Sequence, residues 1–324
     1  MRTWRRRSKI TEPASRSLMK TYLLRRILTT IPILVAISAL VFSMSHLVPG
    51  DPVKLMLGTH ASAERVEAMR EQMGLNDPIA VQYGRFLGNA LQGDFGRSMR
   101  SGRQVFDEIL ARFPSTLELT VFGLLLAIII GVVAGTFAAT AKNPKADMAV
   151  MVGAMIGVSV PGFWFGLLLI MLLCVKFPIF PVAGTGGLNY LVLPAVTLGV
   201  RAAAIIARVT RASLLEVMRQ DYIQFARSKG LSERIVVYKH ALRNALIPVT
   251  TIVGLQFGYF LSGAFIIEVL FARPGIGTLA VNALKQRDFP VIQGVVLFAA
   301  TIYVLTNLIV DIINAIIDPR IQYK

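Results

Sequence analysis

The sequence predicts an all-α polytopic membrane protein with six transmembrane helices and with both termini in the cytoplasm. Three observations support this prediction: 55% of the 324 residues are hydrophobic, only 16% are charged, and the mean hydropathy is +0.63. A soluble domain has about 25% charged residues, and a chain this apolar would collapse rather than stay disordered. The composition therefore excludes an ordinary cytosolic globule and a disordered chain.

Six apolar windows are long enough to cross a bilayer, which takes about 20 helical residues. The fourth window opens with prolines and with Gly184, Gly186 and Gly187, which are typical of a loop. We therefore expect that helix at 191–212, and Arg201 then lies inside it. The windows are residues 27–48, 119–141, 148–175, 177–200, 244–267 and 289–310.

The distribution of charge orients these helices. Segments on one side carry 22 basic and 6 acidic residues, whereas segments on the other side carry 12 basic and 9 acidic residues. Basic residues concentrate on the cytoplasmic side of membrane proteins, so both termini are expected there. Because topology accounts for the formal charge of +16, and no zinc-ligand spacing or basic stripe with interleaved aromatic residues is present, we expect the lipid bilayer and no nucleic acid as a partner.

The chain divides into four parts. Residues 1–18 are polar and Arg-rich, and we expect a disordered extension. Residues 19–48 hold the first transmembrane helix, which is retained because its apolar run is longer than that of a signal peptide. Residues 49–114 form a neutral extracytoplasmic insertion with helices at 63–73 and 79–91, either a cap over the core or a docking surface. Residues 115–324 form a five-helix core.

A charged cytoplasmic loop at 213–245 interrupts the core. Its pattern is helical but broken at Gly230, and Ser232 is suited to cap a second short helix. Such a loop is suited to transmitting force to another protein; the alternative is a solvated linker.

The sequence motifs in this loop resemble the "EAA" loop of bacterial ABC importer permeases, in the version carried by the peptide/nickel family. Of the general pattern Glu-Ala-Ala-x3-Gly, only Ala226 and Gly230 match, and the closing Ile-x-Leu-Pro is replaced by Ala-Leu-Ile-Pro at 245–248. Two motifs that are usual for the peptide subgroup are present. They are Ala-Arg-Ser-Lys-Gly at 226–230 and His-Ala-Leu-Arg-Asn-Ala-Leu-Ile-Pro-Val at 240–249.

The resemblance extends from residue 19 to residue 324 and is closest to the B-type half of a heteromeric pair, similar to dipeptide and glutathione permeases. Further sequence motifs that match this family lie at residues 46–52, 75–78, 92–96, 116–119, 274–277 and 318–321. The family implies a type I ABC importer permease fold in the bacterial cytoplasmic (inner) membrane. It also implies a second, C-type permease subunit, two ATPase subunits and an extracytoplasmic substrate-binding protein.

In such a complex the loop docks on an ATPase as a coupling helix. Ala226 and Gly230 would be the small positions that permit close approach, and Arg227 and Lys229 would supply polar contacts. The resemblance implies a coupling surface made of Asp221, Tyr222, Ala226, Arg227, Lys229, Gly230, Leu231 and Ser232.

No catalytic or metal site is expected in this chain. It has no Gly-Lys dipeptide, hence no Walker-type phosphate loop, and no His-Glu-x-x-His or Gly-x-Ser-x-Gly motif. The chain is therefore expected not to be an enzyme and to hold no cofactor. ATP and Mg²⁺ would bind to the partner ATPase subunits.

Ionisable residues within membrane helices are candidates for function because their burial is costly. We expect Arg201 to face the substrate pathway and attract a carboxylate; the alternative is a pair with an acid such as Asp311. Asp311 is expected to pair with Arg208 or Arg211. Glu118 and Glu268 are expected to stay hydrated near the outer interface.

Four glycine pairs have the small-xxx-small spacing that lets membrane helices approach closely. We expect them to serve packing within the chain or, alternatively, contacts with a second permease. The pairs are Gly131/Gly135, Gly153/Gly157, Gly162/Gly166 and Gly254/Gly258.

The predicted function is ATP-driven import of dipeptides, oligopeptides or glutathione-like peptides by alternating access. Within the family, nickel chelates or another small solute are the alternative cargo. A self-contained, ion-coupled transporter would need inverted repeats with paired discontinuous helices, and an intramembrane protease would need a Ser/His pair at matching depths. Neither pattern is found in the sequence.

Overall fold

The computed structural model describes residues 12–47, 53, 62–72 and 74–317, and this part of the chain is almost entirely helical. Within it the only β pairing is an isolated bridge between Arg97 and Gln104. The all-α prediction is thus confirmed. The helices are α1 (Glu12–Leu47), α3 (Ala63–Gln72), α4 (Ile79–Leu91), α5 (Val105–Thr140), α6 (Pro144–Ser159), α7 (Gly162–Ile170), η1 (Met171–Lys176), α8 (Leu188–Val217), α9 (Asp221–Ser228), α10 (Glu233–Ile235), η2 (Val236–Ala241), α11 (Leu242–Gly263), α12 (Phe265–Leu270), α13 (Ile276–Gln286) and α14 (Phe289–Ile317).

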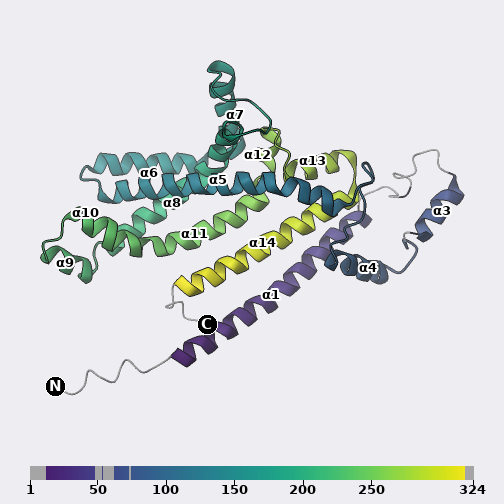
Figure 1. Ribbon diagram of the computed structural model, residues 1–324, viewed down its shortest axis with the longest axis horizontal. Helices are drawn as coiled ribbons and strands as arrows, with labels where there is room; N and C mark the ends of the chain where they lie inside the picture. Colours follow the sequence, from purple (N-terminus) through teal and green to yellow (C-terminus); the bar gives the residue numbers. More distant parts are fainter. Residues whose placement is uncertain (1–11, 48–52, 54–61, 73, 318–324) are drawn as a thin grey trace.

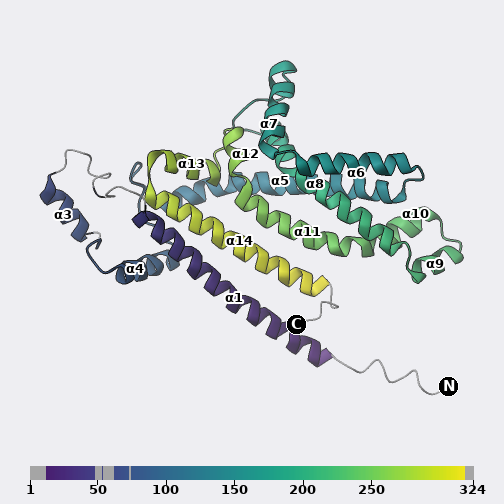
Figure 2. The ribbon, with the colours of Figure 1, turned by 180° about the vertical axis from the view of Figure 1, so that it is seen from behind.

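The long helices form one elongated bundle with two distinct ends (Figures 1 and 2). The central pair is α5 and α8, and α6 and α11 both pack on α8. Helix α14 packs on α11, and α1 packs on α14. One end carries α3, α4 and α13 and is called the insertion end below; the other carries α9 and α10 and is called the loop end.

Four helical segments in the described residues are long and apolar enough to cross a membrane: Val105–Thr140, Leu188–Val217, Glu233–Leu261 and Phe289–Ile313. A fifth crossing results if the bent pair Pro144–Ser159 and Gly162–Lys176 is one span. Helix α1 contains the shorter apolar segment Leu28–Met44, where the sequence predicts the first crossing. The number of six crossings and the side on which the termini lie stay predictions.

The prediction of one continuous helix at 148–175 is wrong. The chain bends by 101° between α6 and the α7–η1 segment. Val160 and Pro161 are both extended at the break, with ψ of 127° and 128°. A proline disfavours the helical conformation at the residue before it and provides no N–H for the helix ladder. The local effect of Pro161 therefore interrupts a run that is apolar throughout.

The N-terminal prediction is changed in part. Residues 1–11 lie outside the described residues, but α1 begins at Glu12, so residues 12–18 are helical rather than a separate extension. Helices α1 and α14 run antiparallel, because Arg26 of α1 pairs with Asp311 of α14 while Gln293 donates a hydrogen bond to the carbonyl of Val41. The expected pairing of Asp311 with Arg208 or Arg211 is therefore wrong.

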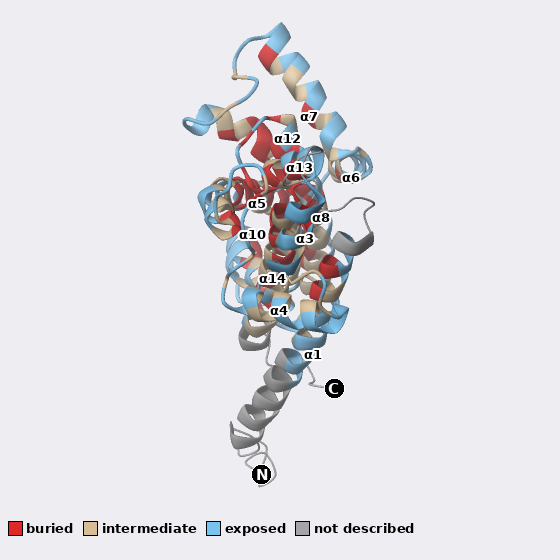
Figure 3. Cartoon of the chain, turned by 90° about the vertical axis from the view of Figure 1, so that its right-hand side faces the viewer, coloured by how far each residue is buried: buried red, intermediate tan, exposed pale blue. Residues whose placement is uncertain are grey.

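Helices α5 and α8 approach closely along a line of small residues. A Cβ atom at Gly135 would lie 2.4 Å from the carbonyl oxygen of Ala207, and one at Gly131 would lie 2.7 Å from the Ile206 side chain. On α8, a Cβ at Gly199 would lie 2.8 Å from the carbonyl oxygen of Gly123. Figure 3 shows that buried residues concentrate on these central helices, whereas α4 has no buried residue and α7 has only Gly166. Glycine thus sets the distance between the two helices.

A buried carboxylate holds the corner between α12 and α13. Glu268 is fully buried and accepts hydrogen bonds from the Thr116 hydroxyl of α5 and from the backbone N–H groups of Gly277 (2.7 Å) and Thr278 (3.4 Å). It therefore caps the N-terminus of α13, where backbone N–H groups lack helical partners. No space remains for a side chain at Gly275, because its Cβ would lie 2.1 Å from the carboxylate.

The sequence predicts that both Glu118 and Glu268 stay hydrated. This prediction is wrong for Glu268 and is confirmed only in part for Glu118. Glu118 is exposed over 59% of its side chain but pairs at 2.9 Å with Arg273, whose side chain is 3% exposed. At Glu268, which lies outside the candidate spans, burial raises the pKa of the carboxyl more than the hydrogen bonds and the nearby Arg273 lower it. The sequence placed both acids near a helix end but could not show what covers them.

We expect Gly135→Ala to destabilise the subunit by about 1–3 kcal/mol, the usual cost of forcing extra volume into a packed core. Gly153→Ala is the matched control, because nothing lies within 4 Å of its added methyl group. The measurement is thermal unfolding of the purified subunit in detergent. Equal melting temperatures for the two variants would contradict the packing of α5 on α8.

We expect Glu268→Ala to cost about 2 kcal/mol, because the Thr116 hydroxyl and the Gly277 N–H would be left buried without a partner. The control is Glu64→Gln at an exposed position on α3, which is expected to leave the melting temperature unchanged.

The stability contribution of Glu268 also depends on pH. Because its pKa is raised on folding, the stabilisation from proton uptake is fully present below the unfolded-state pKa and is lost as pH rises through the folded-state pKa. The melting temperature of the wild-type protein relative to Glu268→Gln should therefore be highest at acid pH and fall as pH rises. A difference that is constant with pH would contradict this assignment.

Candidate functional site

The short helix α9 is held against the bundle by its buried side. Ile223 is fully buried and Ala226 is 8% exposed. Both belong to an apolar cluster with Leu214 of α8 and with Val236 and other residues of η2 and α11. Alternation of buried and exposed positions along α9 follows the helical period, so one face is anchored and the other is free for a partner.

The outward face of α9 is aromatic. Tyr222 is 44% exposed and Phe225 is 61% exposed, and the two lie three residues apart on one face. The ammonium group of Lys229 lies 4.6 Å from the centre of the Phe225 ring. Asp221 and Leu231 are exposed beside them. An exposed patch that joins aromatic rings to charged groups is typical of a protein interaction site. These residues are called the α9 face below.

The turn after α9 is fixed by its backbone and by one ion pair. Gly230 has a φ of +77°, a backbone conformation that other residues rarely adopt. It lies where the sequence pattern predicts a break in the helix. Arg227 pairs with Glu233 at 2.7 Å and so bridges the turn from α9 to α10. Ser232 occupies the N-cap position of α10, but its side chain makes no capping hydrogen bond.

Two residues of the expected coupling surface make contacts within the chain, and their roles toward a partner stay predictions. Ala226 belongs to the chain's own apolar cluster, with residues of α8 and η2. The guanidinium of Arg227 is engaged by Glu233 within the loop. Sequence reasoning also missed Phe225, although its spacing of three from Tyr222 was a usable signal.

A hydrogen bond connects α9 directly to a membrane-spanning segment. The side-chain amide of Asn244 donates to the Tyr222 hydroxyl at 2.7 Å, and Asn244 lies in the first turn of α11. Leu214 of α8 is fully buried against the same loop. Movement of α9 would therefore act on both α8 and α11.

Arg201 lies well inside α8, thirteen residues after its first residue Leu188, which corresponds to about 20 Å along the helix. Its guanidinium lies 5.9 Å from the centre of the Tyr259 ring of α11. The alternative pairing with Asp311 is wrong, because Asp311 pairs with Arg26, and Arg211 pairs with Asp147. Among the described residues, no acid forms an ion pair with Arg201.

Arg201 and Tyr259 line a cavity of 140 Å³ between α7, α8, α11 and α12. Gln256, one turn before Tyr259 on α11, also lines it, and the remaining walls are mostly apolar. Sequence reasoning singled out Arg201 but not Gln256 or Tyr259, because nothing in the sequence indicates which part of α11 packs beside α8. Within the described residues, no group of three His, Cys, Asp or Glu side chains could hold a metal ion.

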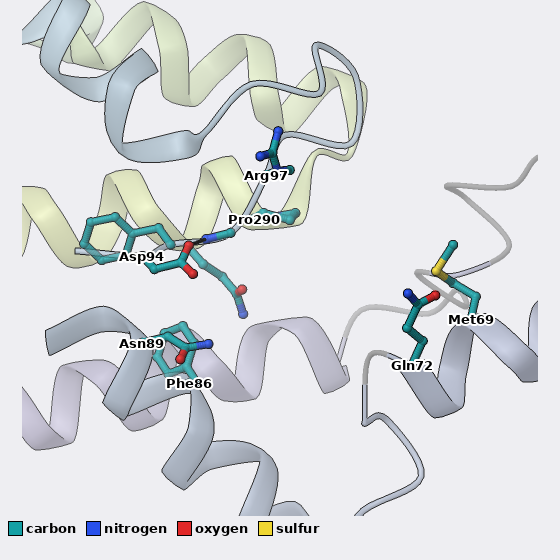
Figure 4. A pocket seen from close by; sticks show the side chains of 10 residues that line it. Met69, Gln72, Phe86, Asn89, Asp94, Arg97 and Pro290 are labelled. Carbon is teal, nitrogen blue, oxygen red and sulfur yellow. Dashed lines mark hydrogen bonds between the residues drawn. The ribbon is translucent and has the colours of Figure 1, made fainter. Parts of the chain in front are cut away.

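A second hollow, of 540 Å³, lies at the insertion end between the predicted insertion and α14 (Figure 4). Met69 and Gln72 of α3 line one side of it, and Phe86 and Asn89 of α4 lie across from them. The loop before α5 is fastened to this end by Asp288, which accepts hydrogen bonds from the Ser98 hydroxyl and the Met99 N–H.

Known proteins resemble the chain over nearly its whole length. It is 44% identical over 306 residues to the "Glutathione transport system permease protein GsiC" of Escherichia coli strain K12, and equally to that of Shigella dysenteriae, with 94% of this chain and 100% of each relative covered. A solved structure, that of "an amino acid ABC transporter with histidines", matches with a TM-score of 0.49 and 17% identity over 66% of this chain and 94% of that one, a likeness too distant to bear on function.

The family comparison covers both parts of the chain. Residues 131–323 match the "Binding-protein-dependent transport system inner membrane component", and residues 19–120 match the N-terminal region of such a membrane component. The chain therefore belongs to the binding-protein-dependent transport system inner membrane component family, as a multi-pass permease subunit of an ABC importer in the inner membrane.

Proposed function

We propose that this subunit imports glutathione or a similar small peptide. The cargo is supported by the printed function of relatives that are 44% identical to this chain and are covered over their entire length. The subunit would act with a second permease subunit, two ATPase subunits and an extracytoplasmic substrate-binding protein, the partners that membership in this family implies.

In this proposal the chain supplies the pore and the partner subunits supply the energy. The sequence contains no Gly-Lys dipeptide and hence no Walker-type loop to hold a triphosphate. ATP and its Mg²⁺ ion would accordingly bind to the ATPase subunits, and the permease would transmit their movement.

The observation that carries this proposal is the geometry of the α9 face. It presents Tyr222 and Phe225 outward, while the buried side of α9 contacts α8 and the Tyr222 hydroxyl contacts α11. An ATPase that displaced α9 would thus move two membrane-spanning helices together. Closure of the ATPases would in this way expose the pathway to each side of the membrane in turn.

The direct test is uptake by the reconstituted transporter. The four membrane-associated subunits are placed in liposomes with ATP inside and the binding protein outside, and radiolabelled glutathione uptake is measured. We expect uptake that requires ATP, the binding protein and this chain. Uptake by this chain alone, driven by an ion gradient, would contradict the proposal, and uptake of other peptides but not glutathione would correct the cargo.

The α9 face generates a separate prediction. Phe225→Ala should lower ATPase-coupled uptake and copurification of the ATPase roughly tenfold, because exposed aromatic anchors typically contribute 1–2 kcal/mol or more to binding. The melting temperature should not change, since 61% of this side chain is exposed.

Phe177→Ala is the matched control, because Phe177 is a similarly exposed aromatic residue (50%) that lies outside the loop. Ile223→Ala, in contrast, should lower the melting temperature, because it removes a fully buried anchor of α9. If Phe225→Ala and Phe177→Ala had equal effects on ATPase copurification, the α9 face would not be the coupling surface.

A further inference from the structure

Unlike Arg26 and Arg211, Arg201 has no counter-charge among the described residues. Arg26 pairs with Asp311 and Arg211 pairs with Asp147, whereas no acid among the described residues pairs with Arg201, which is exposed on the surface of this chain. A charged side chain inside a membrane is stable only beside a partner or in water. The surface that carries Arg201 therefore cannot simply face lipid.

The groups around Arg201 suit an anion. The ring of Tyr259 lies 5.9 Å from the guanidinium, which leaves its planar set of N–H donors available at the edge. Gln256 lines the same cavity, and its side-chain amide forms no hydrogen bond within the described part of the chain. Two unsatisfied donor groups thus meet in a cavity whose walls are otherwise largely apolar.

A second cation continues this surface toward the loop end. Arg208 lies seven residues after Arg201, so the two side chains leave α8 on the same face, about 10 Å apart along the helix axis. Arg208 is also exposed, and no acid pairs with it among the described residues. A carboxylate that leaves Arg201 would meet a second cation about two turns further on.

We propose that Arg201, Gln256 and Tyr259 form a binding station for a carboxylate of the transported peptide, with Arg208 as the next contact. This inference rests on the proposed peptide cargo. The guanidinium fork matches the geometry of a carboxylate. Because the cavity of 140 Å³ is smaller than a tripeptide needs, it accommodates the terminal carboxylate rather than the whole substrate.

The first test compares glutathione with its glycine ethyl ester in the reconstituted transporter; in the ester an uncharged ethyl ester group replaces the glycine carboxylate. The same binding protein is used throughout. Its own preference between glutathione and the ester is therefore the same for every permease variant and does not affect the comparison. Arg201→Gln should reduce glutathione uptake roughly tenfold, as expected from loss of a charged hydrogen-bonding partner, and leave ester uptake within about twofold. Arg201→Lys should be intermediate, because it keeps the charge but loses the fork.

Lys285→Gln is the matched control, because it removes an exposed positive charge at the insertion end, and it should change neither rate. If Arg201→Gln left the ratio of glutathione to ester uptake unchanged, the proposal would be overturned. If it prevented assembly of the complex and Arg201→Lys restored both assembly and an unchanged ratio, Arg201 would be assigned to a contact between subunits.

The second test does not depend on the cargo. Cys174 is the single cysteine of the chain, so Gln256→Cys in a Cys174→Ser background places one thiol beside Arg201. In the assembled complex this thiol should react several-fold faster with a sulfonate-bearing methanethiosulfonate than with an ammonium-bearing one, because a nearby positive charge attracts the anionic reagent. Adding Arg201→Gln should abolish this preference.

An unreactive thiol, or a preference that survives Arg201→Gln, would overturn the proposal even if the transporter moves peptides. Conversely, if the wild-type complex takes up neither substrate while the thiol shows the Arg201-dependent preference, the peptide cargo would be wrong and the anion-binding station would stand. The two failures are therefore distinguishable.

Discussion

The close contact between α5 and α8 is the constraint on which the rest of the structure depends. It requires glycine where the helices meet, because a methyl group at Gly135 would collide with the backbone of α8. Helices α6 and α11 pack against α8 in turn, and α14 packs on α11. A displacement of α8 away from α5 would therefore disturb almost every other contact in the bundle.

Helix α8 also connects the two parts of the candidate site. It carries Arg201 in its interior and Leu214 near its end, where Leu214 anchors α9. Thirteen residues separate these positions, or about 20 Å along one continuous helix. A force on the α9 face thus has a rigid route to the cavity beside Arg201, and the hydrogen bond from Asn244 to Tyr222 provides a second route through α11.

Much of the fold follows from local sequence, and the errors have local or tertiary causes. Helix α4 has the bounds expected from the sequence, and Gly230 has the left-handed backbone that the broken pattern indicates. The bend at Pro161 was missed because hydropathy is summed over about 20 residues, whereas proline acts on one peptide group. The inward orientation of Ala226 could not be predicted, because the face that α9 buries depends on where η2 and α8 lie.

The sequence by itself determined that the chain is helical, that it is a membrane protein, and where its charged loop with the break at Gly230 lies. These features follow from hydropathy, from glycine and proline positions and from short sequence motifs, all of which are local in the sequence. Only the tertiary structure decided which charges meet: Asp311 pairs with Arg26, 285 residues away, and Glu268 caps a helix while it holds Thr116 of α5. A charge interacts with whatever lies within a few ångströms, and packing alone decides that. For the same reason, packing leaves Arg201 beside Tyr259 and without an acid partner among the described residues.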